Sequence, residues 1–232
     1  MSEPYDEGSY DKGSRDVGTV EPGGAIDRGL RERFGWTPYR VLAGAALFGC
    51  VAVLLADVVM WFLVEGYSPI GQTISELAAG PHHAVQDTGI VLFALGIVSL
   101  AVALILRGRS GARAWTVRLG FLALAGVVAL IALRNEYGDG RPGGVEIHRY
   151  LVGALYVLVG ALLWLGSAVR PAAEDRSARL GKPLAVAWAL LAPLFYLVPD
   201  GVDGLYERAL ALFLVGCVGI AALRLWRNPA TE

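Results

Sequence analysis

Charged residues are scarce in this sequence: they form 18% of its 232 positions, whereas hydrophobic residues form 55%. Mean hydropathy is +0.53. Because an average soluble domain contains about 25% charged residues, these values favour membrane spans over a large soluble core. The formal net charge of −1 gives no electrostatic attraction for nucleic acid. We therefore expect a membrane protein whose partners are membrane lipids or another membrane protein, and not nucleic acid.

Cysteine is nearly absent. Cys50 and Cys217 both lie within apolar runs, where a thiol behaves as a small hydrophobe, so no disulfide scaffold is indicated. The sequence lacks the H-E-x-x-H, P-loop and G-x-S-x-G patterns of zinc proteases, nucleotidases and serine hydrolases. A literal G-x-G-x-x-G at 138–143 follows an apolar helix and contains a proline, so we interpret it as a turn. We expect no cofactor.

Large apolar residues are almost missing from residues 1–33, where Gly, Ser, Asp and Glu dominate. Such a segment cannot bury enough surface to offset its ordering entropy, so we expect a disordered acidic and glycine-rich tail. Residues 34–227 form the predicted transmembrane domain, and 228–232 form a short C-terminal tail.

Six long apolar runs occupy the transmembrane domain. Each approaches the ~20 residues that cross ~30 Å of hydrocarbon. The fifth contains Pro193, which is tolerated where neighbouring helices satisfy the freed carbonyl group. The fold class is therefore all-α, a polytopic protein with six transmembrane helices, at approximately 41–64, 88–106, 115–133, 150–169, 183–199 and 206–225.

The basic residues are distributed unequally between the two sides of these spans. From Arg28 onward, fourteen fall on one side, and only Arg134, Arg141, Arg149 and Arg208 fall on the other. Since positive charge marks cytoplasmic loops, we expect both termini to be cytoplasmic, in the plasma membrane. The fourteen are Arg28, Arg31, Arg33, Arg40, Arg107, Arg109, Arg113, Arg118, Arg170, Arg176, Arg179, Lys182, Arg224 and Arg227.

The first external connection, residues 65–87, contains a helical pattern. Ser68 and Pro69 suit an N-cap and a first helical position. Ile70, Ile74 and Leu77 then form one apolar stripe. We predict a short amphipathic helix that lies at the membrane interface. The alternative is an ordinary connecting loop that contains one helical turn.

Polar residues gather at the external ends of the spans, where they face inward between helices. Asp57 lies about eight residues before Glu65, so roughly 12 Å below the end of the first span. At that depth a carboxylate needs a partner, and Arg134, Arg149 and Arg208 are at the correct end. The predicted outer polar cluster contains Asp57, Ser75, Glu76, His148, Arg149, Glu207 and Arg208.

Asp57 has two interpretations, a proton or substrate site and a paired carboxylate that holds helices together. A metal site is a weaker alternative. His83 and Asp87 are four residues apart and would share a helix face, and His82 or His148 would complete a three-ligand set. Histidines at a membrane interface explain the same residues, so we expect no metal.

Short motifs at the external ends resemble a known family. They are Tyr67-Ser68-Pro69 with Ile74-Ser75-Glu76-Leu77, Ile147-His148-Arg149, and Gly204-Leu205-Tyr206-Glu207-Arg208. They resemble the bacterial and archaeal membrane family catalogued as domain of unknown function 998 (DUF998), over about residues 38–227. Glu76, where aspartate is as frequent, and the acidic tail depart from it. The resemblance implies six helices and no established activity. A looser likeness to Frag1/DRAM/Sfk1-type membrane proteins has the same implication.

Three function classes follow from these features. The first is a non-enzymatic protein that binds lipid or another membrane protein, which requires only the fold and the polar cluster. An outer-leaflet, lipid-directed hydrolase would need a metal or a Ser-His-acid arrangement. A small proton-coupled transporter would use Asp57 as its proton carrier, although no inverted repeat is visible.

The unequal distribution of basic residues predicts the topology of the chain. A cysteine at position 72, introduced after Cys50 and Cys217 are replaced, should react with a membrane-impermeant thiol reagent added outside intact cells. Reaction of this cysteine only after the cytoplasmic face is exposed would contradict the prediction.

Overall fold

The computed structural model describes residues 38–107, 111–134, 147–169 and 176–227. Both predicted tails and the turn at 138–143 lie outside these residues. Within the described part of the chain the fold is all helical, which confirms the predicted class. Six spans are long and apolar enough to cross a membrane. They are α2 (Pro38–Leu63), α4 (His83–Leu106), α5 (Ala112–Leu133), α6 (Ile147–Val169), α7 (Arg176–Leu191) continued by the 3-10 helix η1 (Ala192–Leu197), and α8 (Asp203–Arg227).

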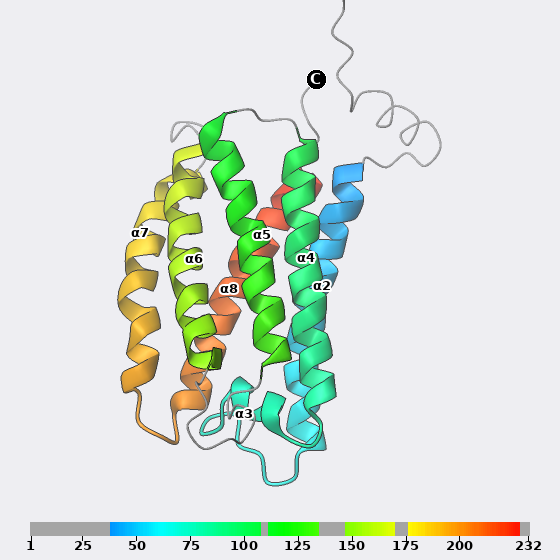
Figure 1. Ribbon diagram of the computed structural model, residues 1–232, viewed down its shortest axis with the longest axis vertical. Coiled ribbons are helices and arrows are strands. Elements are labelled where there is room, and N and C mark those ends of the chain that lie inside the picture. The colour runs from blue at the N-terminus through cyan, green and yellow to red at the C-terminus, as the bar shows by residue number, and fades with distance from the viewer. Residues whose placement is uncertain (1–37, 108–110, 135–146, 170–175, 228–232) are drawn as a thin grey trace, which may run out of the picture.

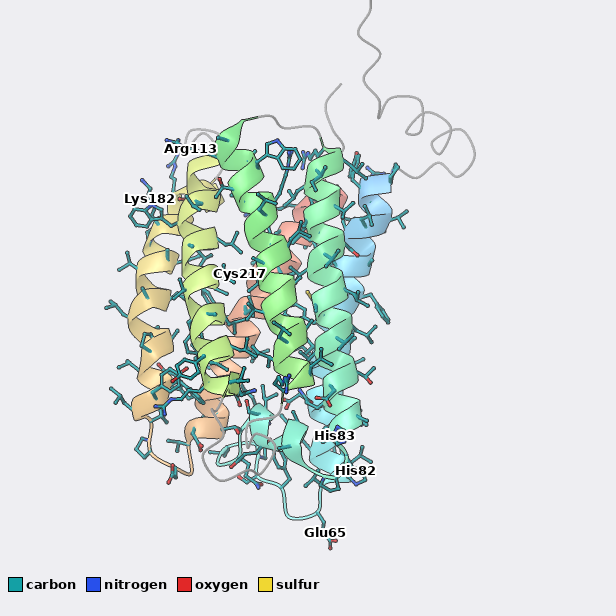
Figure 2. The ribbon with its side chains drawn as sticks, viewed as in Figure 1. Glu65, His82, His83, Arg113, Lys182 and Cys217 are labelled. Atoms are coloured by element: carbon teal, nitrogen blue, oxygen red, sulfur yellow. The ribbon has the colours of Figure 1, made fainter. Side chains whose placement is uncertain are left out.

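The six spans run alternately up and down in one bundle (Figure 1). Helix α4 packs between α2 and α5, α6 packs on α5 and α7, and α8 packs along α2. The short helix α3 (Ile74–Ala79) lies across one end of the bundle, which we call the α3 end. Arg113 and Lys182 lie at the opposite end from Glu65, His82 and His83 (Figure 2). The folded chain therefore keeps the separation of charge that its sequence predicts.

Helices α4 and α7 begin before the apolar runs do. The run predicted from 88 starts as a helix at His83, and the run predicted from 183 starts at Arg176. The first turns of both helices are polar, so hydropathy alone does not detect them. Near its other end the fifth span tightens into η1, with Pro193 in the first turn. Proline has no N–H to continue an α-helix, which accounts for the change.

Glycines allow α2 and α4 to approach closely. A Cβ atom on Gly49 would lie 2.6 Å from the Leu92 carbonyl oxygen, and one on Gly89 would lie 2.4 Å from the Ala56 Cβ. Between membrane helices, packing of this kind replaces the hydrophobic effect as the main source of association. Helices α2 and α4 are thus closely packed, and α2 carries Asp57 near the α3 end.

Gly49 should tolerate no side chain. We expect Gly49→Ala to destabilise the protein by about 1–3 kcal/mol, because the new methyl group meets backbone that has no room to move. The matched control is Gly126→Ala on α5, where a Cβ meets nothing within 4 Å. The control should be neutral or stabilising by up to ~1 kcal/mol through helix propensity. Thermal unfolding in detergent compares the two, and equal effects would contradict the close approach.

Candidate functional site

Helix α3 begins later than its apolar stripe suggests. Its N-cap is Thr73, whose hydroxyl accepts from the Glu76 N–H at 3.0 Å, while the Glu76 carboxylate accepts from the Thr73 N–H at 2.8 Å. This reciprocal capping box is visible in the sequence as T-x-x-E. The predicted start at Ser68 and Pro69 is wrong, and Ile70 lies outside the helix and is 53% exposed. The short helix itself is confirmed.

The turn at Ser68 does not continue into a helix because the carbonyl groups that follow Ser68 accept hydrogen bonds from another helix. The Ser68 carbonyl accepts from the Gln72 N–H at 2.9 Å, which closes one turn. The next carbonyls, of Pro69 and Ile70, instead accept hydrogen bonds from α8. Long-range contacts to the last span therefore fix the conformation of the first connection.

Arg208, in the first turns of α8, provides most of these contacts. Its Nε donates to Asp57 Oδ2 at 3.1 Å, and its Nη2 donates to Asp57 Oδ1 at 3.0 Å. This bidentate geometry is the strongest form of an arginine–carboxylate pair. The two side chains are 8% and 13% exposed. The pair joins the first span to the last.

The other hydrogen bonds of Arg208 reach three backbone carbonyl groups and one hydroxyl group. Its Nη1 lies 2.9 Å from the Pro69 oxygen, 2.8 Å from the Gln72 oxygen and 3.0 Å from the Gly204 oxygen. Its Nη2 also donates to the Tyr67 hydroxyl. Every nitrogen of the guanidinium is therefore bonded, as a buried charge requires.

Tyr67 completes this arrangement, which we call the Arg208 network. Burial raises the pKa of Tyr67 to about 12, even though the charge of Arg208 acts to lower it. The hydroxyl therefore stays protonated at neutral pH and donates to the Gln72 carbonyl at 3.0 Å. The α8 backbone fits closely here, because a Cβ on Gly204 would lie 2.2 Å from the Gln72 oxygen.

A second set of contacts, the Ser75 network, lies beside the first. The Ser75 Oγ is 2.8 Å from Glu207 Oε1 and 3.0 Å from His148 Nε2. The other Glu207 oxygen accepts from the backbone N–H groups of Ile74 and Ser75. The network therefore connects α3, α6 and α8 through one hydroxyl group.

His148 is held in one orientation. Its Nδ1 lies 2.8 Å from the Arg134 carbonyl oxygen, and the residue is only 6% exposed. A carbonyl group accepts and never donates, so Nδ1 carries a proton and Nε2 is the nitrogen that faces Ser75. The group that orients His148 is thus a backbone carbonyl, which the pattern of side chains in the sequence does not predict.

The structure brings together five of the seven residues predicted for the outer polar cluster. Asp57 and Arg208 meet in one network, and Ser75, Glu207 and His148 meet in the other. Glu76 is used in the capping box, and Arg149 is exposed, with its guanidinium 5.4 Å from the Tyr196 ring. Sequence reasoning missed Tyr67, Thr73 and the carbonyl groups of Pro69, Gln72 and Arg134.

The pairing of Asp57 bears on its two interpretations. A proton carrier must be accessible to bind and release a proton, but both oxygens of the Asp57 carboxylate accept hydrogen bonds from the buried Arg208 guanidinium. The geometry favours the paired carboxylate that connects helices. Transport through Asp57 would require this pair to separate.

The alternative metal ligands are not brought together. His83 Nδ1 lies 2.9 Å from Asp87 Oδ2 on an exposed face of α4. His148 instead contacts the Ser75 hydroxyl and the Arg134 carbonyl group, as part of the Ser75 network. Within the described ranges, no group of three His, Cys, Asp or Glu side chains is placed to hold a metal ion.

Comparison with known proteins identifies the family of this chain. The family model described as "Protein of unknown function (DUF998)" matches residues 33–224. This protein belongs to the DUF998 family. The match covers nearly the whole span of the predicted resemblance and includes every residue of both networks. The looser likeness to Frag1/DRAM/Sfk1-type proteins is not shown. No curated protein and no solved structure matches the chain.

The Arg208 network generates a prediction about stability. Arg208→Ala leaves the Asp57 carboxylate without its partner, which costs about 3–5 kcal/mol in a fully buried pair. Because Asp57 retains 13% exposure, we expect a loss near the lower end. Asp57→Asn keeps the shape and removes the charge, so it should be milder and should partly rescue Arg208→Ala.

Thermal unfolding in detergent of the two single variants and the double variant measures this coupling. Arg149→Ala is the control, since its exposed guanidinium rests on Tyr196 and contacts neither network. Additive effects of Asp57→Asn and Arg208→Ala would show that the two residues do not stabilise one another.

Proposed function

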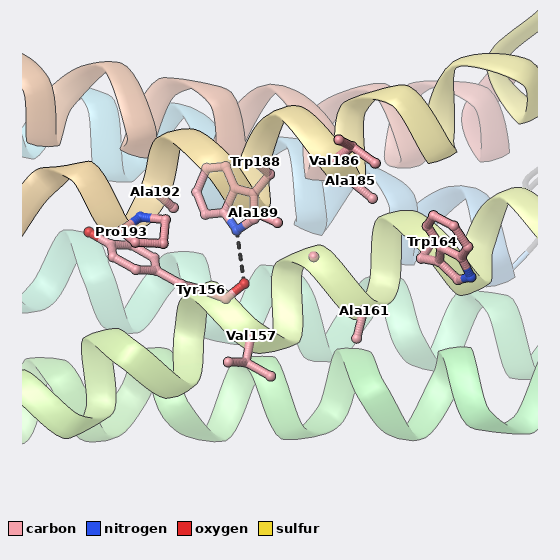
Figure 3. A pocket seen from close by; sticks show the side chains of 11 residues that line it. Tyr156, Val157, Ala161, Trp164, Ala185, Val186, Trp188, Ala189, Ala192 and Pro193 are labelled. Carbon is pink, nitrogen blue, oxygen red and sulfur yellow. Dashed lines mark hydrogen bonds between the residues drawn. The ribbon is translucent and has the colours of Figure 1, made fainter.

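We propose that this DUF998 protein binds an anionic membrane lipid along a lateral groove between α6 and α7. The observation that supports it is an apolar cavity of about 430 Å³ on the surface of these two helices (Figure 3). As part of the proposal, the protein lies in the plasma membrane with both termini cytoplasmic. In this proposal the groove, which lies along two helices long and apolar enough to span a membrane, faces the hydrocarbon region of the bilayer.

The groove arises from the sizes of its lining residues. Tyr156 and Trp188 form one part of the wall, and the Trp188 Nε1 donates to the Tyr156 carbonyl at 2.8 Å. Small residues such as Gly160, Ala161 and Ala189 leave the space between the aromatic rings open. An unfilled space of this kind loses dispersion contacts, whereas a flexible hydrocarbon chain restores them. An acyl chain is therefore the occupant that suits the lining.

Charge at one end of the groove favours an anionic headgroup. Trp164 lines the groove, and the Lys182 Nζ lies 5.4 Å from the centre of its ring. Lys182 is exposed and lies, with Arg113, at the end of the bundle opposite the α3 end (Figure 2). Tryptophan and lysine are typical of the interface, where lysine attracts anionic lipid. One lipid would thus contact Lys182 by its headgroup and the α6–α7 groove by its chain.

Filling the groove should displace the lipid. The double variant Ala161→Phe, Ala189→Phe places two rings in the cavity, and we expect native mass spectrometry of detergent-purified protein to show at least a several-fold loss of bound phospholipid. Ala123→Phe, at an exposed position on α5, is the matched control and should leave lipid occupancy unchanged.

Lys182→Gln tests the choice of headgroup. In nanodiscs that contain anionic and zwitterionic lipid together, this variant should retain less of the anionic lipid while the total occupancy of the groove changes little. Undiminished lipid in the doubly substituted protein would contradict the proposal.

A further inference from the structure

Ser75 lies between two bases. Its hydroxyl is within hydrogen-bond reach of His148 Nε2 on one side and of Glu207 Oε1 on the other. We propose that Ser75 is the nucleophile of an acyl-transfer site, with His148 as its general base and lipid acyl esters as its substrates. This inference rests on the Ser75 network and is independent of the α6–α7 groove.

The geometry meets the requirements for an activated serine. A nucleophile needs a base within about 2.6–3.2 Å, and the base needs a third group that orients it. The Ser75 Oγ to His148 Nε2 distance is 3.0 Å, and the Arg134 carbonyl holds Nδ1 at 2.8 Å. Since Nδ1 carries the proton in neutral His148, its Nε2 has a free lone pair within reach of the Ser75 Oγ. The Ser75 hydroxyl donates to Glu207 Oε1 in this structure, and it turns to Nε2 when it reacts.

Charge around the site favours transfer of the serine proton. When His148 takes the proton, the imidazolium has the Arg134 carbonyl on one side and the Glu207 carboxylate across the Ser75 oxygen on the other. Both stabilise positive charge in a buried position. Arg208, which follows Glu207 in the chain, is paired with Asp57, so its charge is balanced within the other network. Arg149, which follows His148, is exposed and lies over the Tyr196 ring.

The step balances with water as the only co-reactant. Ser75 Oγ bonds to the ester carbonyl carbon while its proton moves to His148 Nε2. The bond from that carbon to the leaving alcohol oxygen then breaks, and the alcohol takes the proton from Nε2. Water then loses a proton to Nε2 and bonds to the acyl carbon. The bond from that carbon to Ser75 Oγ breaks, Oγ takes the proton back from Nε2, and the carboxylic acid leaves.

The position of the network identifies the ester. Helix α3 lies at the end of the bundle where α6 and α8 begin (Figure 1), and Ser75 is only half-buried. The ends of membrane spans coincide with the interfacial region, between the hydrocarbon and the headgroups. The ester bonds of membrane lipids lie at this same depth, so a lipid ester can approach Ser75 without leaving the bilayer.

A fluorophosphonate probe tests the nucleophile directly, since it forms a covalent adduct with an activated serine. In full-length protein in nanodiscs, we expect an adduct on Ser75 and none in Ser75→Ala. General bases contribute about 10²–10⁴-fold, so His148→Gln should slow labelling at least ~100-fold. Ser99, whose hydroxyl donates to the Leu95 carbonyl, is the comparison serine and should remain unlabelled.

The labelled site separates this role from a purely structural one. A hydrogen bond that only connects helices would change the melting temperature of the variants but would leave the wild-type serine inert. Mapping of the adduct by mass spectrometry needs only the folded wild-type protein, so an unstable Ser75→Ala variant does not compromise it. Folded protein without an adduct on Ser75, or a labelling rate that His148→Gln leaves unchanged, would overturn the proposal.

Discussion

The α3 end of this protein is built around one buried guanidinium. Away from water, each nitrogen of Arg208 needs an acceptor, and α8 itself supplies only the Gly204 carbonyl. The other acceptors come from Asp57 on the first span and from the connection that follows it. Satisfying one side chain therefore fixes the turn before α3, and this turn places Ser75 against Glu207 and His148.

Much of this arrangement follows from the sequence, but the parts that depend on distant contacts do not. The depth of Asp57 in its span requires a cation, and the order of the spans leaves three arginines at the correct end. Which arginine serves depends on the angular position around each helix. His148 and Arg149 are neighbours, yet only the histidine faces inward, because successive residues on a helix point about 100° apart. Likewise, the residue at which α3 begins depends on the Pro69 and Ile70 carbonyl groups, which accept hydrogen bonds from α8.

Helix α6 links the two regions to which we assign function. Its first turn carries His148, and Tyr156 and Trp164 line the groove farther along the same helix. The two regions nevertheless rest on different physics. The Ser75 network depends on hydrogen-bond direction and on a fixed tautomer, whereas the groove depends only on the volumes of its lining side chains.

The ion pair of Asp57 and Arg208 also has a consequence for biosynthesis. The two residues are 151 positions apart, on the first and last spans, so Asp57 enters the bilayer long before its partner is synthesised. Until α8 inserts, the carboxylate lacks its Arg208 partner, and the carbonyl groups of the first connection lack the donors that α8 supplies. A chain that ends early thus keeps an uncompensated charge within its first span. In this way a single contact distinguishes a completed polypeptide from a truncated one.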